Sequence, residues 1–176
     1  MKWAVIIVGG LIGIVVLVAL IGALQPRDHV ASMTTTIAAP PERVWAALTD
    51  VMSYPSWRSG VQRIELVSQP PAPLSWREHT KQGVMTFAVE AFEPPRRMVG
   101  RIADKNLPFG GAWEYVLAPD ATDPGKTRVT ITERGYVTNP IFRFVSRFVI
   151  GHHSTLDIYL KDLGKKFGNE VVPARA

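Results

Sequence analysis

Two glutamates stand at positions where the surrounding pattern is apolar. Glu133 follows Val129 and Ile131 at alternate positions, and Glu78 follows Trp76 in the same way. Because successive side chains of a strand point to opposite faces, each carboxyl group shares the inward face of its apolar neighbours. A buried carboxylate without a partner is neutralised by a raised pKa, so each of these acids needs a partner.

His152 lies in an apolar stripe with helical spacing. An imidazole that faces a carboxylate can position a ligand hydroxyl or transfer a proton near neutral pH. Glu133 and His152 are therefore the candidate catalytic residues. The structural alternative is that Glu78 and Glu133 lie at solvated strand ends beside arginine, and that His152 is a hydrogen-bonded core histidine.

Other chemistry is excluded or unsupported by the residue types present. The 176 residues include no cysteine, which excludes disulfides, thiol catalysis, iron–sulfur clusters and Cys-ligated zinc. The adjacent His152 and His153 point apart on a helix and make a poor metal pair. We predict no metal and no cofactor. The net charge is +5, but the basic residues are scattered, so nucleic acid is not an expected partner.

The elements that carry these residues are short strand-like runs separated by turn residues. A threonine-rich strand at 30–38 precedes one or two short helices from Pro41 to about Trp57, since proline favours a helix start. Further strands are predicted at 61–68, 74–81, 84–92, 97–102, 112–118 and 127–137. Six strands in succession predict an antiparallel meander.

After Asn139 the spacing of apolar residues becomes helical. The stripe consists of Ile141, Val145, Phe148, His152, Leu156, Tyr159, Leu163 and Phe167. Only the sheet is available to bury such a stripe, so we predict an α+β fold in which a curved antiparallel sheet wraps around a long C-terminal helix. Gly151 is expected to bend this helix midway.

An uncharged stretch at Ala4 to Leu24 precedes the folded region. As a helix it is about 32 Å long, enough to span a bilayer. A cleaved signal peptide is the alternative, but this stretch is longer than an ordinary signal core and no small-x-small cleavage site follows it. We predict an uncleaved single-pass anchor and a short linker over residues 1–29, a ligand-binding domain over 30–170 and a tail over 171–176.

The charges that flank the anchor predict that the amino terminus lies in the cytoplasm. The domain would then lie on the extracytoplasmic side. Gly9 and Gly13 form a Gly-xxx-Gly pair, for which close packing of two anchors into a weak homodimer is one interpretation and ordinary membrane-helix glycine is the other.

Several motifs resemble the SRPBCC superfamily, the START/Bet v 1-like helix-grip proteins. Those near the start are Ala39–Trp45 (APPERVW), Asp50 and Tyr54–Trp57 (YPSW). Phe92–Arg97 (FEPPRR), Leu107–Trp113 (LPFGGAW) and Thr130–Glu133 (TITE) resemble the bacterial polyketide cyclase/dehydrase-like branch. The resemblance implies a helix-grip fold with two short helices after the first strand, and places the anchor in a bacterial inner membrane.

The resemblance also implies a hydrophobic cavity between sheet and helix. Strand alternation turns large rings inward, where they either fill a core or line a pocket. Phe109 lies in a Gly/Pro-rich loop that acts either as a lid or as a tight strand connection. The predicted ligand-binding residues are Trp57, Trp76, Glu78, Phe87, Phe109, Trp113, Tyr115, Glu133, His152 and Tyr159.

Two functions are consistent with these observations. The first is a membrane-anchored protein that holds a hydrophobic or amphipathic small molecule, lipid-like or polyketide-like, in the internal cavity. The alternative is a polyketide cyclase/dehydrase-like enzyme that uses Glu133 and His152 as general acid and base in the same cavity.

Overall fold

A single antiparallel sheet organises the domain. The computed structural model describes residues 2–176, apart from the side chains of Ala4 and Val5. Within this range eight strands pair in the order β2-β3-β4-β5-β6-β7-β1-β8. Their bounds are β1 (Asp28–Ile37), β2 (Val61–Ser68), β3 (Ser75–Thr80), β4 (Gly83–Glu93), β5 (Arg97–Ile102), β6 (Phe109–Pro119), β7 (Thr127–Val137) and β8 (Ala174–Arg175). The predicted meander is confirmed.

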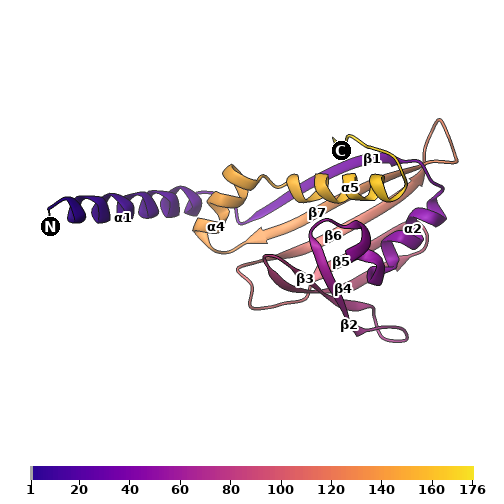
Figure 1. The fold of residues 1–176 in the computed structure, drawn as a ribbon, viewed down its shortest axis with the longest axis horizontal. Coiled ribbons are helices and arrows are strands. Elements are labelled where there is room, and N and C mark those ends of the chain that lie inside the picture. The colour runs from indigo at the N-terminus through magenta and orange to yellow at the C-terminus, as the bar shows by residue number, and fades with distance from the viewer. Residues whose placement is uncertain (1) are drawn as a thin grey trace.

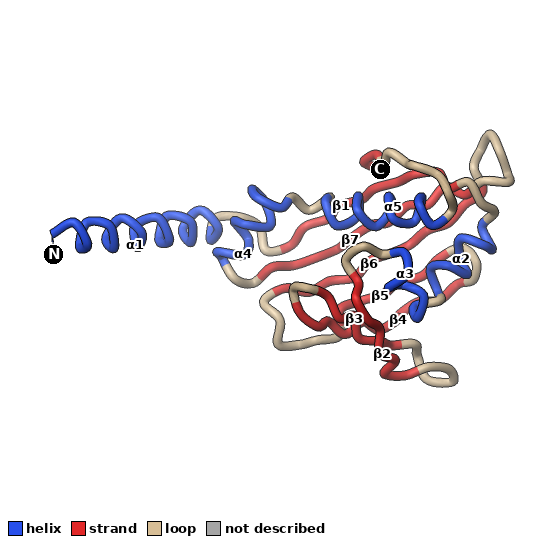
Figure 2. Tube along the Cα trace, in the orientation of Figure 1, coloured by secondary structure: helices blue, strands red, loops and turns tan. Residues whose placement is uncertain are grey.

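Helices lie over one face of this curved sheet (Figure 1). The connection after β1 forms α2 (Pro41–Thr49), the 3-10 turn η1 (Val51–Ser53) and α3 (Tyr54–Trp57), as predicted. Figure 2 shows these helices and α5 (Ser154–Lys166) over the strands. Leu48 of α2 and Leu156, Leu160 and Leu163 of α5 are fully buried in one core, and each such side chain stabilises the fold by about 2 kcal/mol. The helix-grip architecture is confirmed.

The C-terminal helix is broken rather than continuous. It consists of α4 (Pro140–Val145), a π-helical turn η2 (Ser146–Ile150) and α5, separated at Gly151, which has a φ of +80°. A left-handed residue ends a helix, and glycine adopts this conformation without steric cost. The expectation that the whole stripe is buried on the sheet is therefore wrong for its first half, where Ile141 and Phe148 are exposed.

The N-terminal helix α1 (Lys2–Ala23) extends away from the domain (Figure 1). Its window Ile6–Ala23 has a mean hydropathy of 2.9 and is 6% buried, so it is a candidate membrane span and not a helix of the domain core. Gly9 and Gly13 face open space, and the homodimer stays a prediction.

The end of α1 is joined tightly to α4. A Cβ at Gly22 would collide with the Pro140 carbonyl oxygen. Arg143 Nη1 donates to the Gln25 carbonyl oxygen at 2.9 Å and to that of Ala23 at 3.4 Å. A cation that satisfies the free carbonyls at a helix C-terminus stabilises that end. The junction therefore fixes the C-terminal end of α1 against α4.

Candidate functional site

A buried ion pair occupies the space between α3, α5 and the sheet. Arg58 Nη1 lies 2.5 Å from Glu78 Oε1, and Glu78 is only 3% exposed. The Trp76 indole donates to the same carboxylate oxygen at 3.0 Å. The Arg58 guanidinium lies 4.8 Å from the centroids of both the Tyr54 and Tyr159 rings. Glu78 thus has the arginine partner that the structural alternative expected, although it is buried and not at a solvated strand end.

Two further contacts position Arg58. The backbone N–H and the hydroxyl of Ser59 donate to Asp162 of α5 at 2.8 and 2.7 Å. Burial opposes the charge on Arg58, but the nearby Glu78 carboxylate raises the pKa of the guanidinium above its ordinary value. Arg58 is therefore a fixed cation inside the domain, and it is not among the residues predicted from the sequence.

Three of the other predicted ligand-binding rings gather around Tyr159, and these four residues form the ring cluster. The rings of Trp57, Trp113 and Tyr115 lie 5.6, 5.8 and 5.7 Å from the Tyr159 ring, between centroids. Trp76 stacks on Phe87 at 5.7 Å. These distances are typical of packed aromatic pairs. Burial raises the pKa of Tyr115 and of Tyr159, so both phenols are neutral at physiological pH.

Phe109 lies apart from this ring cluster. It is the first residue of β6 and pairs with Val137 of β7. The backbone N–H of Thr138 donates to the Pro108 carbonyl oxygen at 2.8 Å. The end of the loop is therefore tied to the sheet, as the strand-connection alternative expects.

His29 brings the two candidate catalytic residues together. Its Nε2 lies 3.4 Å from Glu133 Oε1, and its ring stacks on that of His152 with centroids 3.9 Å apart. His29 pairs with Gly135 across the β1–β7 ladder, where a Cβ would lie 2.5 Å from the imidazole. Sequence reasoning missed His29, although the alternation of Ala31 and Met33 extends back to it.

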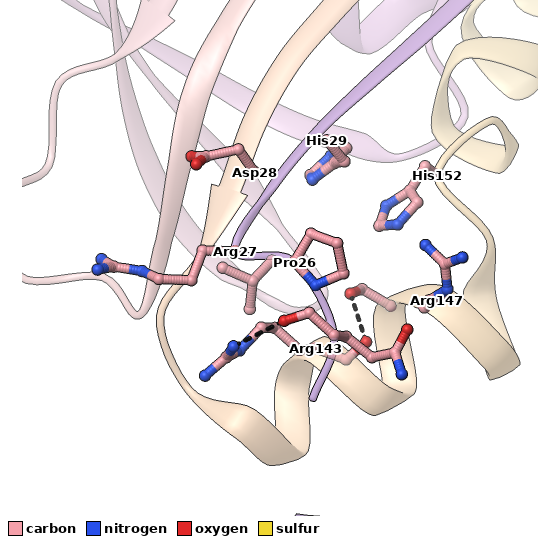
Figure 3. A pocket seen from close by; sticks show the side chains of 10 residues that line it. Pro26, Arg27, Asp28, His29, Arg143, Arg147 and His152 are labelled. Atoms are coloured by element: carbon pink, nitrogen blue, oxygen red, sulfur yellow. Dashed lines mark hydrogen bonds between the residues drawn. The ribbon is translucent and has the colours of Figure 1, made fainter. Parts of the chain in front are cut away.

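Burial shifts the pKa values of Glu133, His29 and His152. Burial raises the pKa of Glu133 to about 7, and a hydrogen bond with the Trp113 side chain partly opposes this shift. Burial also lowers the pKa of both His29 and His152. A carboxyl group with a pKa near neutral pH beside an imidazole is suited to general acid–base chemistry. His29 and His152 line a pocket of about 20 Å³, the volume of one water, beside Arg143 and Arg147 (Figure 3).

Replacing Glu133 by glutamine should remove a pH-dependent loss of stability. The folded-state pKa of Glu133 lies above its unfolded value, so the folded protein binds a proton that the unfolded chain releases. Stability falls as pH rises from about 5 to about 7, by roughly 2 kcal/mol for this partly exposed group. Urea unfolding at several pH values should show this difference between the wild type and Glu133→Gln. Parallel curves would contradict it.

The larger depression is an apolar groove at the other end of the sheet. It has a volume of about 540 Å³ and lies between the end of α2, η1, the β2–β3 loop and β4. Its apolar lining includes Met52, Leu66, Leu74, Val89 and Phe92. Met52, Leu66 and Phe92 are 54%, 40% and 51% exposed, so these side chains are available to a ligand.

Polar groups stand among this apolar lining. Thr49, Asp50, Gln69 and Glu90 line the same groove. An apolar pocket of several hundred Å³ with a few polar groups is typical of small-molecule sites. No metal centre accompanies it, since across residues 2–176 no three His, Asp or Glu side chains gather to hold an ion.

Comparison with known proteins identifies the family. Residues 28–153 match the family described as "Polyketide cyclase / dehydrase and lipid transport". This region covers most of the chain, and the chain belongs to that family. No curated protein matches the sequence.

Solved structures share the fold at low identity. A START superfamily protein from Mycobacterium smegmatis is 18% identical with a TM-score of 0.64, over 79% of this chain and 97% of that one. The Zhui aromatase/cyclase from Streptomyces is 15% identical with a TM-score of 0.63, over 79% and 93%. A Thermus thermophilus protein is 20% identical with a TM-score of 0.65, over 79% and 97%. The START-like fold is thereby established.

Proposed function

We propose that this protein binds a hydrophobic or amphipathic small molecule in the apolar groove while α1 holds it at a membrane. The observation that carries the proposal is the groove of about 540 Å³ with half-exposed apolar side chains along its walls. Covering such side chains with a ligand removes apolar area from water, worth about 25 cal/mol per Å² before the costs of binding.

The groove and the ring cluster share a boundary. Val89 lines the groove and also packs against both buried clusters, which include Tyr159 and Trp76. None of the predicted ligand-binding residues lines the groove itself, and Val89 is the contact between the groove and the packed rings behind it. A site formed by packed elements favours binding, because a preformed site loses little conformational entropy when a ligand enters.

The layout separates the groove from the anchor. Figure 1 shows α1 leaving one end of the domain and α2 at the other. A ligand in the groove would approach from the side of the domain that faces away from the end of α1. The extracytoplasmic orientation of the domain remains part of this proposal, and protease digestion of sealed vesicles tests it.

Native mass spectrometry of the full-length protein, extracted in mild detergent, tests the binding function. We expect one apolar molecule to remain bound per chain. Its mass should equal that of a molecule recovered from the protein by solvent extraction. Protein that stays unliganded after incubation with total bilayer lipids and with fatty acids would contradict the proposal.

A second function is favoured by the His29, Glu133 and His152 cluster. A carboxyl group with a pKa of about 7 beside an imidazole is suited to remove a proton α to a carbonyl. One neighbour in fold is named an aromatase/cyclase. Turnover of a synthetic poly-β-keto thioester that is lost in Glu133→Gln would support an enzyme. If the wild type shows no turnover, the enzyme function is contradicted and only the binding function remains.

A further inference from the structure

A group of exposed apolar side chains lies close to the end of α1, although it is far from α1 in the sequence. In α4 and η2 these residues are Ile141, Phe142, Phe148, Val149 and Ile150. Single exposed apolar residues are ordinary on a protein surface, whereas a continuous group marks a contact site. The only charged residues in 140–150 are two arginines, Arg143 and Arg147.

The position of this segment indicates what it contacts. The Gly22–Pro140 approach and the Arg143 hydrogen bonds fix α4 beside the last turn of α1. Figure 1 shows α4 next to that end of α1, on the side of the domain from which α1 departs. If α1 spans a bilayer, α4 and η2 lie at the level where the helix leaves the hydrocarbon region.

The charges of the segment fit the same location. Arg147 is exposed, and Arg27 and Arg143 line the same small pocket (Figure 3). Segments that combine phenylalanine and aliphatic residues with arginine are typical of elements that lie in a bilayer interface. Arginine near the surface is attracted to anionic headgroups. Of the acidic residues, Asp28 alone lines this pocket.

We infer that residues 140–150 form a second membrane-contacting element that inserts its apolar side chains into the headgroup region of a bilayer containing anionic phospholipid. This inference rests on the membrane anchoring proposed above. A single spanning helix can tilt in the bilayer, and the domain joined tightly to its end tilts with it. A second contact at α4 and η2 fixes the orientation of the sheet relative to the bilayer and keeps the groove directed away from it.

The absence of cysteine allows a direct test on the full-length chain. Val149→Cys, Ile14→Cys and Val172→Cys each receive one fluorescent label, and each protein is reconstituted in vesicles of phosphatidylglycerol and phosphatidylcholine. Val172 is the matched control for Val149, because both are strongly exposed valines outside α1. Lipids that carry a nitroxide quencher at shallow or deep positions report contact regardless of which way the protein inserted.

We expect the shallow quencher to act on the Val149 label, the deep quencher on the Ile14 label and neither on the Val172 label. If the Ile14 label is quenched while the Val149 label stays as unquenched as the Val172 label, the inference is overturned and the anchor stands. An unquenched Ile14 label overturns both the anchor and the inference. Ligand retention, measured separately, decides the binding function.

Arg147→Gln tests the role of charge. Each arginine near an anionic surface contributes about fivefold to the insertion equilibrium, so this variant should weaken shallow quenching of the Val149 label in phosphatidylglycerol vesicles. In vesicles of phosphatidylcholine alone the variant and its parent should match. Equal quenching of both proteins in the anionic vesicles would overturn the requirement for anionic phospholipid.

Discussion

Replacing Arg58 by methionine should lower the free energy of unfolding by about 3–5 kcal/mol. The substitution leaves the Glu78 carboxylate buried without its partner, and it removes the guanidinium from between the Tyr54 and Tyr159 rings. Breaking a buried pair from one side is costly because the remaining charge has neither water nor counterion. Denaturant unfolding of the full-length protein in mild detergent measures the loss.

Two further variants make this result specific. Arg77→Met removes a cation from the exposed pair with Glu65, where the side chains are 2.9 Å apart, and should cost less than about 1 kcal/mol. The double variant Arg58→Met, Glu78→Leu should recover much of the lost stability, because it removes the orphaned charge. If Arg58→Met and Arg77→Met cost the same, the interior ion pair stabilises the fold no more than an exposed pair does.

Replacing Leu66 by arginine should weaken binding of a dansyl-labelled fatty acid by about tenfold or more, since a charged group in the groove must be desolvated when the ligand enters. Leu66 is already partly exposed, so the folded domain should lose little stability. Fluorescence titration of the full-length protein gives the dissociation constant, and unfolding curves check the fold.

The neighbouring residue provides the matched control. Val67 has a similar exposure, 47%, and is not among the residues that line the groove. Val67→Arg should keep the affinity within about twofold of the wild type, because the same charge then remains in water. Equal weakening by both variants would mean that net charge, and not the groove, controls binding.

The sheet was predictable because its signals are local. Alternation places Ile131 and Val129 inward in β7, and the same pattern in β3 turns Trp76 and Glu78 inward. Each of these strands is bounded by turn residues, so its approximate limits follow from composition. Consecutive antiparallel strands pair with their neighbours, and the meander then follows without knowledge of the packing.

The break in the C-terminal helix was only partly predictable. Gly151 signals a bend, but no local pattern predicts the π-helical turn before it or the packing of α4 on α1, a contact between segments more than 100 residues apart. The start of β6 at Phe109 depends on pairing with Val137, which composition does not report. At Phe109 a tertiary contact decides the local structure.

The residues of the candidate site were likewise only partly predictable from the sequence. The inward faces of Glu133 and Trp113 follow from strand phase, and the helical position of Tyr159 follows from its stripe. The stacking of His29 on His152 requires the β1–β7 register together with the helix break. The groove requires the spacing of four separate segments, and no period in the sequence carries that information.

The most direct test of the groove as the ligand site is photo-cross-linking of the full-length protein with a diazirine-bearing fatty acid, followed by peptide mapping. We predict cross-links on η1 and the end of α2, on the 69–74 loop, and on Val89 or Phe92 of β4. Competition by unlabelled fatty acid should remove them. Cross-links confined to the ring cluster around Tyr159, or to α1, would contradict the assignment of the groove.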